Sequence, residues 1–397
     1  MEYIRFGELY GIPTSNGVSR PSAVRGQGFH MINMGELFAH NIIDEMPMER
    51  VLLSEKEQKK FLVQKGDLLF ARQSLVAAGA GKCSFVNNII EPTTFESHLI
   101  RVRLDKKKSD SKYYYYLFQL PYNPIKAIVN QCAQAGIRGS ELQKVKVPYP
   151  SLPTQRRIAS ILSAYDNLIE NNNKRIRLLE QMAENLYKEW FAYHRIKDSA
   201  KEIRLTEIVS YSRGLSYSSE EIDCEDGNDL INLKNIQAFG GFRLDGTKKY
   251  DGLYKEEQIV IEGDLIMGVT DMTQDRRTVG SVALIPNITN LSVISADLIK
   301  LKSDIDNVYL YAMFRWGNVS RYIAQFANGA NVLHLRPQVL KNIKVMLPQK
   351  TLIEKYVSTV RPMIETINKL NTENDLLSRQ RDLLLPRLMS GKLEVKE

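Results

Sequence analysis

The stretch LSAYDNLIENNNKRIRLLEQM, from Leu162 to Met182, decides how the chain is organised. Its apolar side chains recur at alternating steps of four and three residues, which is the spacing of a long helix with a narrow apolar seam. Three consecutive asparagines stand at its centre, and one of them, Asn172, falls inside the seam. A rod in the middle of a chain of 397 residues separates two other parts, so the sequences on either side have to be compared.

The first rod is predicted to begin just after Pro153, with Thr154 as its N-cap. About 37 residues at 1.5 Å each make it roughly 55 Å long. A second stretch with the same seam lies near the C-terminus and contains Asn374. Pro362 is expected to break or kink this second rod, and Pro386 is expected to loosen its last turns.

Two rods of the same design favour mutual pairing as a coiled coil, in which the rod acts as a spacer. An asparagine in an apolar seam lowers stability but restricts the register of the pair. The residues predicted to pair the helices are Ile158, Leu162, Ile169, Asn172, Ile176, Leu179, Leu186, Ile367, Leu370, Asn374, Leu377 and Leu384.

The chain is internally duplicated over nearly its whole length. Six ordered matches relate its two halves at shifts of 195 to 199 residues, among them VQKGDLLFAR (63–72) with VIEGDLIMGV (260–269) and SHLIRVRL (97–104) with ADLIKLKS (296–303). Each copy shows short β-branched runs, a Gly-Asp turn that precedes a predicted strand, and one helix-like segment before the rod. The predicted fold class is α+β: two duplicated α/β-type domains separated by two long helices.

The domain boundaries follow from the repeat. The first globular domain spans residues 1–150, the first helical spacer 151–194, the second globular domain 195–346 and the second helical spacer 347–397.

Composition indicates a cytoplasmic, globular protein with a polyanionic partner. The chain opens without a basic-then-apolar leader, and no apolar run reaches the roughly 18 residues of a membrane helix. Its three cysteines are too few and too scattered for a disulfide framework. The net charge is +8, and residues 1–152 carry 20 basic and 14 acidic side chains whereas residues 192–347 carry 19 and 20. A phosphate-binding excess is therefore confined to the first half.

The two rods carry a family resemblance. PSLPTQRRIASILSAYDNLIENNNKRIRLLEQMAENLYKEWF and LPQKTLIEKYVSTVRPMIETINKLNTENDLLSRQRDLLLPRLMSGKL, each preceded by a GDLL or GDLI unit, resemble the DNA-specificity subunit of type I restriction–modification systems. Pro153, Gln155 and Ile158 fit the family pattern of Leu-Pro, then Gln and Ile, then a coil. The second copy keeps Pro348 and Ile353 but departs from the pattern at Lys350.

The resemblance implies that each globular copy is a target-recognition domain for one half of a split DNA sequence. It also implies antiparallel rods, an orientation that the connection length alone leaves open. The implied partners are double-stranded DNA, two methyltransferase subunits and restriction or translocase subunits, with S-adenosylmethionine, ATP and Mg²⁺ bound by those partners. No cofactor or metal is expected in this chain.

The residues agree with a chain that lacks catalytic machinery. AAGAGKCS (77–84) resembles a phosphate-binding loop, but Val76 stands where its first glycine belongs and Cys83 where its Ser or Thr belongs. Methyltransferase and nuclease motifs are missing from the sequence, and the five histidines show no metal-ligand spacing. A binding protein is therefore expected.

Base reading requires side-chain donors and acceptors on loops, with Arg suited to guanine and Asn or Gln suited to adenine. Three predicted loops per copy qualify: 14–28, 71–82 and 134–140, then 212–219, 268–277 and 328–337. The candidate DNA-contacting residues are Arg20, Arg25, Arg72, Gln73, Lys82 and Arg138 in the first copy, and Arg213, Arg276, Arg277, His334 and Arg336 in the second.

Two other interpretations remain open at the level of sequence. The specificity chain of a two-subunit type II restriction–modification enzyme shares the duplicated plan. A coiled-coil interaction scaffold without nucleic acid would fit the net charge of −1 in residues 192–347.

Overall fold

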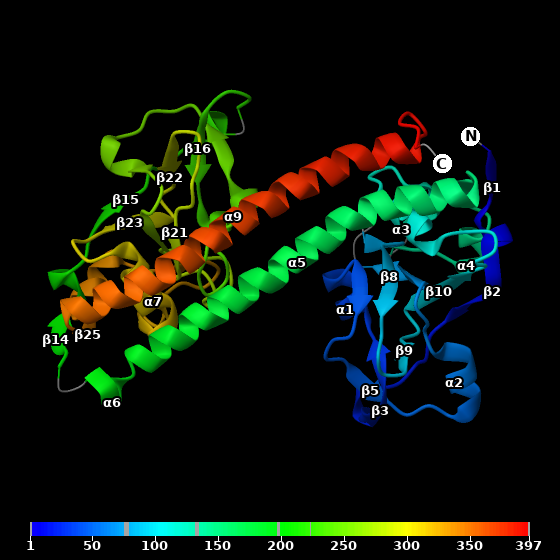
Figure 1. Cartoon of the computed structure of the whole chain (residues 1–397), viewed down its shortest axis with the longest axis horizontal. Coiled ribbons are helices and arrows are strands. Elements are labelled where there is room, and N and C mark those ends of the chain that lie inside the picture. Colours follow the sequence, from blue (N-terminus) through cyan, green and yellow to red (C-terminus); the bar gives the residue numbers. More distant parts are fainter. Residues whose placement is uncertain (1, 75–78, 132–134, 197–198, 223, 396–397) are drawn as a thin grey trace. The chain divides into compact units, whose positions relative to one another are not determined.

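The chain forms two compact units, Met1–Ile169 with Leu376–Glu397, and Glu170–Asp375. Each unit contains one globular copy and one part of each long helix (Figure 1). We refer to them as unit 1 and unit 2. The computed structural model describes residues 2–74, 79–131, 135–196, 199–222 and 224–395.

The two long helices, α5 (Leu152–Trp190) and α9 (Lys350–Met389), are antiparallel. In unit 1 the beginning of α5 packs in one core with the end of α9, where Leu162 and Leu388 are both buried. In unit 2 the end of α5 meets the beginning of α9, and the hydroxyl of Tyr356 donates to the carbonyl of Ala183 at 3.2 Å. The antiparallel coiled coil that the family resemblance implied is therefore confirmed.

The two seam asparagines meet each other inside unit 2. Nδ2 of Asn172 donates to Oδ1 of Asn374 at 3.1 Å, and Nδ2 of Asn374 donates to Oδ1 of Asn173 at 3.0 Å. Asn172 and Asn374 are only 4% and 9% exposed. Because a buried amide has to find its partner, a slip of the helices by one turn would leave both amides unsatisfied.

The helix ends differ from the prediction in two respects. Helix α5 begins at Leu152, and the hydroxyl of Ser151 accepts from the Thr154 amide at 3.3 Å, so Ser151 and not Thr154 is positioned as the cap. Pro153 fits inside the first turn because amides there need no acceptor within the helix.

Helix α9 is not interrupted at Pro362, contrary to the expected break. The ring of Pro362 lies on the exposed side of the helix, while Val360 and Met363 on either side pack into or against the core of unit 2. Packing of the flanking residues therefore outweighs the lost backbone hydrogen bond. The last turns also stay ordered past Pro386, with Leu388 only 1% exposed, and Gly391 follows the end at a φ of 71°.

Unit 1 is built on a five-stranded sheet in the order β2-β10-β6-β8-β4, with smaller sheets β5-β3-β9, β11-β12-β7 and β1-β13. Its further elements in chain order are β1 (Tyr3–Arg5), β2 (Tyr10–Asn16), β3 (Arg25–Ile32), α1 (Met34–Ala39), β4 (Ile42–Asp44), β5 (Glu49–Val51), α2 (Glu55–Phe61), β6 (Leu68–Ala71), β7 (Gln73–Ser74), β8 (Cys83–Asn88), β9 (Thr93–Phe95), β10 (Leu99–Leu104), α3 (Ser111–Gln119), β11 (Asn130–Gln131), β12 (Ala135–Gly136), α4 (Gly139–Leu142) and β13 (Lys146–Pro148).

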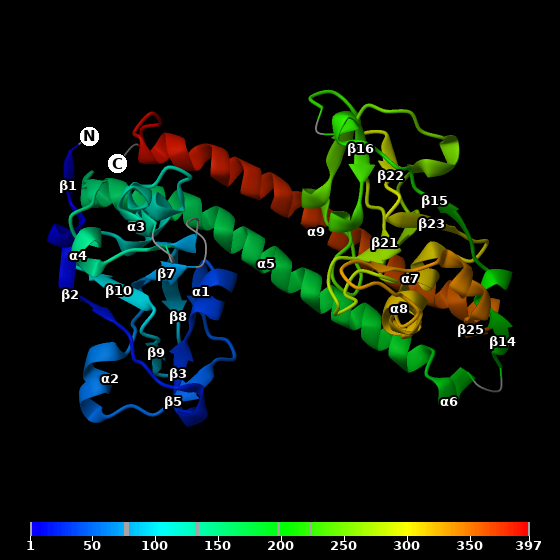
Figure 2. The ribbon, with the colours of Figure 1, turned by 180° about the vertical axis from the view of Figure 1, so that it is seen from behind.

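Unit 2 repeats the plan with sheets β15-β23-β19-β21, β17-β16-β22-β18, β14-β25 and β20-β24. Figure 2 shows its helices α7 and α8 beside the strands. Its further elements are α6 (Tyr193–Ile196), β14 (Lys201–Arg204), β15 (Ser210–Arg213), β16 (Asn228–Ile231), β17 (Lys248–Tyr250), β18 (Ile259–Val260), β19 (Leu265–Gly268), β20 (Thr270–Asp271), β21 (Val282–Leu284), β22 (Ser292–Ile294), β23 (Leu298–Lys302), α7 (Asn307–Trp316), α8 (Val319–Ala324), β24 (Leu333–His334) and β25 (Lys344–Leu347).

The Gly-Asp turns that marked the repeat form the same structure in both units. Gly66 and Gly263 have φ values of 95° and 85°, a conformation that glycine adopts without strain. The carboxylates of Asp67 and Asp264 accept the amides of Gln64 at 2.8 Å and Ile261 at 3.0 Å. Each turn leads directly into a central buried strand, β6 or β19, which confirms the predicted duplication.

The globular parts are attached to the long helices through buried aromatic helices. In unit 1, Tyr116 of α3 donates to Asp166 of α5 at 2.5 Å, and Arg381 of α9 pairs with the same carboxylate at 2.7 Å. In unit 2, Arg315 of α7 pairs with Glu180 of α5 at 2.8 Å. Within the described residues, no helix has the length and apolar character of a membrane span.

Candidate nucleic-acid interface

One edge of the main sheet in unit 1 brings together three segments that are far apart in the sequence. Strand β10 pairs with β2 at Ile100–Asn16 and with β6 at Leu99–Ala71. The end of β2, the end of β6 and the beginning of β10 therefore lie at the same edge. We call this the reading edge of unit 1.

Backbone hydrogen bonds join the predicted loops 71–82 and 134–140 at the reading edge. The Arg72 amide donates to the carbonyl of His98 at 2.8 Å, and the Ile137 amide donates to the carbonyl of Arg72 at 2.9 Å. Strand β7 pairs with β12, so Gln73 lies opposite Gly136. Arg72, Gln73 and the exposed Arg138 thus belong to one structural cluster, whereas residues 75–78 and 134 of these loops lie outside the described residues.

Unit 2 builds the same edge. The Val269 amide donates to the carbonyl of Asp297 at 2.8 Å, and the Leu335 amide donates to the carbonyl of Val269 at 2.8 Å. Strand β20 pairs with β24, so Thr270 lies opposite His334. The predicted loops 268–277 and 328–337 are therefore neighbours, and they expose His334 and Arg336.

The first predicted loop of each copy approaches its reading edge through a glycine. A Cβ on Gly17 would lie 1.9 Å from the carbonyl oxygen of Phe95, and one on Gly214 would lie 2.0 Å from that of Ser295. No residue larger than glycine fits this close approach, which places the ends of β2 and β15 beside the edge. Arg213, at the end of β15, is exposed.

Arg20, Arg25 and Lys82 already have partners within unit 1. Arg20 pairs with Glu57 at 2.6 Å, and Arg25 pairs with Glu49 at 2.6 Å. The ammonium group of Lys82 donates to the carbonyl of Phe38 at 2.6 Å, and its burial lowers its pKa. These three cations therefore contribute to local structure, in contrast to the exposed Arg138.

The pKa of Glu57 is lowered to about 2. The hydrogen bond from the Ser54 amide is its largest cause, followed by the hydrogen bond from Arg20. This carboxylate is therefore ionised and keeps Arg20 engaged at neutral pH.

Asp271 shapes the exposed loop that follows β20. Its carboxylate accepts the amides of Thr273 at 2.8 Å and Thr278 at 2.6 Å. Burial opposes ionisation of this group, but the hydrogen bonds prevail and its pKa is lowered. The loop presents Arg276, whose φ is 53°, and Arg277, which pairs with Asp275 at 2.5 Å.

Sequence reasoning missed four residues at the reading edges: His98, Thr270, Asp271 and Asp297. His98 pairs with Gln73, and Thr270 pairs with Asp297. Nδ1 of His98 lies 2.9 Å from Oε1 of Gln73, and the hydroxyl of Thr270 donates to Oδ1 of Asp297 at 2.9 Å. The repeat already aligned His98 with Asp297, directly before the start of a strand in both copies. Comparison of the two copies position by position would have identified them.

One group in the described part of the chain places possible metal ligands together: His30, Glu45 and Glu91. Nδ1 of His30 lies 3.2 Å from Oε1 of Glu45. Glu45 also accepts the amide of Ile90 at 2.8 Å, and Glu91 pairs with Arg50 at 2.8 Å. Both carboxylates therefore have protein partners, and we assign no metal to them. Histidine spacing in the sequence did not indicate this group.

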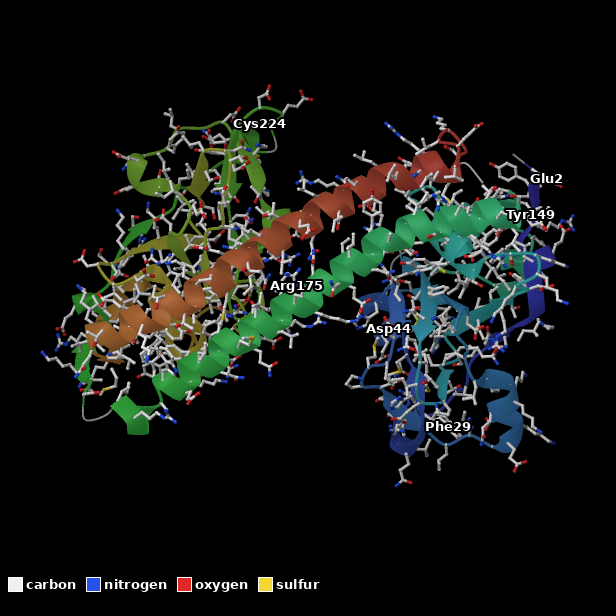
Figure 3. All side chains as sticks on the ribbon, in the orientation of Figure 1. Glu2, Phe29, Asp44, Tyr149, Arg175 and Cys224 are labelled. Atoms are coloured by element: carbon white, nitrogen blue, oxygen red, sulfur yellow. The ribbon has the colours of Figure 1, made fainter. Side chains whose placement is uncertain are left out.

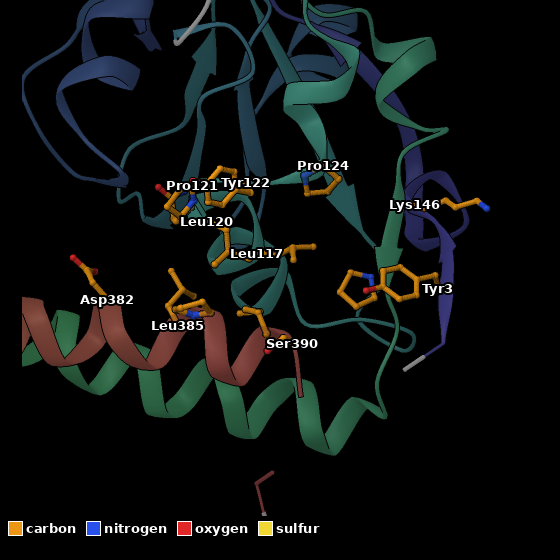
Figure 4. Close-up of a pocket in the computed structure, with 14 residues that line it drawn as sticks. Tyr3, Leu117, Leu120, Pro121, Tyr122, Pro124, Lys146, Asp382, Leu385 and Ser390 are labelled. Carbon is orange, nitrogen blue, oxygen red and sulfur yellow. The ribbon is translucent and has the colours of Figure 1, made fainter. Parts of the chain in front are cut away.

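Unit 1 also has an apolar cavity of about 730 Å³, whose lining includes none of the residues of the reading edge. Tyr3, Leu117, Tyr122 and Leu385 line it, from β1, α3, the segment after α3, and α9 (Figure 4). Because the exposed surface of its lining is mostly apolar, this cavity does not suit base reading. Arg175 of α5 is an exposed charge beside the seam residue Ile176 (Figure 3).

Comparison with known proteins agrees with this architecture. Residues 22–181 match the family model of the type I restriction modification DNA specificity domain. The chain is 26% identical over 317 residues to the type I restriction enzyme MjaIX specificity subunit of Methanocaldococcus jannaschii. This match covers 72% of this chain and 70% of that protein. It is 21% identical over 412 residues to the type I restriction enzyme HindI specificity subunit of Haemophilus influenzae. This match covers 85% of this chain and 88% of that protein.

The fold is also shared with a solved structure. The S subunit of a type I restriction–modification system from M. genitalium superposes with a TM-score of 0.61 at 14% identity, over 98% of this chain and 95% of that one. In sequence, the chain is therefore similar to specificity subunits of type I restriction–modification systems.

Proposed function

We propose that the chain recognises a bipartite DNA target, with one half-site read by each unit, and that it carries the methyltransferase and restriction subunits that act on this target. The observation that supports the proposal is the reading edge, which has the same backbone hydrogen bonds in both units but different side chains. Two equal frameworks with different side chains are what two half-sites of different sequence require.

The chemistry of the exposed residues fits this role. Arg138 and Arg336 occupy equivalent positions after Ile137 and Leu335, and both are exposed. An arginine can donate two hydrogen bonds to guanine O6 and N7 in the major groove, which is the commonest specific protein–DNA contact. The net charge of +8 adds a salt-sensitive attraction to phosphates that does not depend on sequence.

Under this proposal the chain supplies recognition and its partners supply catalysis. Methyltransferase subunits would bind S-adenosylmethionine, and restriction or translocase subunits would use ATP and Mg²⁺. The chain alone is expected to bind DNA weakly and to show no methyl transfer, nucleolysis or ATP turnover.

The test is to purify the full-length chain with the subunits that accompany it and to map the bases methylated by the complex. Methylation at one split target supports the proposal. A fused methyltransferase–nuclease as the only partner would favour the two-subunit type II alternative. A lone homodimer without affinity for duplex DNA, measured at low salt, would contradict the proposal and favour the scaffold.

A further inference from the structure

Each reading edge contains one hydrogen-bonded pair of side chains. The two pairs occupy equivalent positions, but their chemistry differs between the units. The equivalence rests on the backbone: His98 and Asp297 accept the amides of Arg72 and Val269, respectively, at 2.8 Å in both cases. In unit 1 the residue after Arg72, Gln73, bonds to the side chain of His98. In unit 2 the residue after Val269, Thr270, bonds to the side chain of Asp297.

The pair in unit 1 presents mainly donors. The amide oxygen of Gln73 can only accept, so Nδ1 of His98 carries the proton in this 2.9 Å hydrogen bond. Within the described residues, no hydrogen bond engages the two N–H groups of the Gln73 amide, so they can donate. Gln73 is half-buried and His98 is exposed, so both can be reached from solvent.

The pair in unit 2 presents an acceptor. Thr270 donates its hydroxyl proton to Oδ1 of Asp297, and Oδ2 stays available to accept. Within the described residues, no ion pair engages Asp297, which is half-buried directly before β23. A carboxylate in this position would repel phosphates, but it suits the N4 amino group of cytosine or the N6 amino group of adenine.

Each pair is held by a hydrogen bond within the protein, which favours a role in selectivity. A side chain held by a neighbour loses less conformational entropy when it binds, and it cannot easily turn to accommodate a wrong base. The same geometry at both edges also argues against two unrelated surface contacts, because the side chains changed type while the hydrogen bond between them was kept.

We propose that Gln73 with His98, and Thr270 with Asp297, are specificity-determining pairs, and that each reads base edges in its own half-site. The pair in unit 2 selects a base that presents an amino group in the major groove. The pair in unit 1 selects a base that presents an acceptor. This inference rests on the proposed function, because it assigns individual readers within the bipartite target.

The experiment compares variants of the full-length chain in complex with its methyltransferase subunits. The probe is a library of duplexes in which each position of the mapped target is randomised in turn. Asp297→Asn replaces the free acceptor by an amide of the same shape, and it is expected to lower methylation of the original base at one position of one half-site about tenfold or more. His98→Ala is expected to change a position in the other half-site only.

Matched controls lie at the opposite ends of the same strands. Asp304→Asn, just after β23, and Lys106→Ala, just after β10, change exposed charges and are expected to leave both half-sites unchanged. Thr270→Ser keeps the hydroxyl donor and should retain wild-type selectivity, whereas Thr270→Val should follow Asp297→Asn. The serine variant thus distinguishes loss of the pair from a general failure to fold.

The inference would be overturned if Asp297→Asn kept wild-type selectivity. It would also be overturned if Asp297→Asn and His98→Ala changed the same half-site. Either result would leave the proposed function intact. If the wild-type complex methylated no split target at all, the proposed function itself would fail.

Discussion

At the scale of the residue, the structure places similar arginines of the predicted loops in different surroundings. Arg20 and Arg25 pair with glutamates, and their charge is used within unit 1. Arg138 and Arg336 are exposed at equivalent positions next to the two side-chain pairs. Only the latter combine exposure with a fixed backbone, which is what a base contact needs.

Arg138→Ala and Arg336→Ala are therefore expected to alter selectivity in different half-sites. If each arginine donates two hydrogen bonds to a guanine, its loss should cost about 1–3 kcal/mol at that base and little elsewhere. Mapping the methylated targets of each variant in cells measures this directly. Arg20→Ala is the control, because its partner is Glu57, and it should leave selectivity unchanged. Loss of the same base in both arginine variants would contradict one reader per unit.

At the scale of the element, the sequence was informative wherever the pattern was local or repeated. The heptad seam, the Gly-Asp turns and the duplicated strands follow from spacing along the chain, and all three are present. The N-cap was predicted at Thr154, three residues after the observed cap Ser151. Proline is accepted at more than one position near a helix start, so Pro153 did not fix the position of the cap. The pairing of Gln73 with His98 depends on a sheet that joins residues 25 positions apart, so spacing alone could not reveal it.

The contact between Asn172 and Asn374 can be measured by a double-mutant cycle. Asn172→Ala removes the donor to Asn374 and is expected to destabilise unit 2 by about 1–3 kcal/mol, because a buried amide oxygen loses its partner. Asn374→Ala should cost a similar amount, and the double variant should cost less than the sum. Denaturant unfolding, followed by a probe on the second globular copy, gives each value. Strict additivity would show that the two amides do not stabilise each other.

At the scale of the whole molecule, antiparallel pairing has a consequence for the proposed bipartite DNA target. Each unit uses the beginning of one long helix and the end of the other, so α5 and α9 both contribute residues to both units. A change in the length of one helix therefore requires a matched change in the other. Asn172 and Asn374 lie opposite each other, so segments at equal distances from these two residues have to be matched.

Removal of residues 173–179 from α5 together with 367–373 from α9 should shorten the unspecified spacer of the target and leave both half-sites unchanged. Each deletion takes out one heptad, about 10 Å of helix at 1.5 Å per residue, and DNA advances about 3.4 Å per base pair. The spacer should therefore lose up to about three base pairs. Whole heptads preserve the apolar seam, whereas a deletion of two residues would turn seam positions towards water.

The assay has to measure binding and not methylation, because three base pairs also rotate one half-site around the duplex relative to the other. Docked methyltransferase subunits could lose their substrate geometry while recognition stays intact. Duplexes should therefore be selected by binding from a library in which the spacer length is varied. Recovery of a shorter spacer between the original half-sites supports helices that set the distance. Recovery of the original spacer with full affinity would show that another part of the protein sets it.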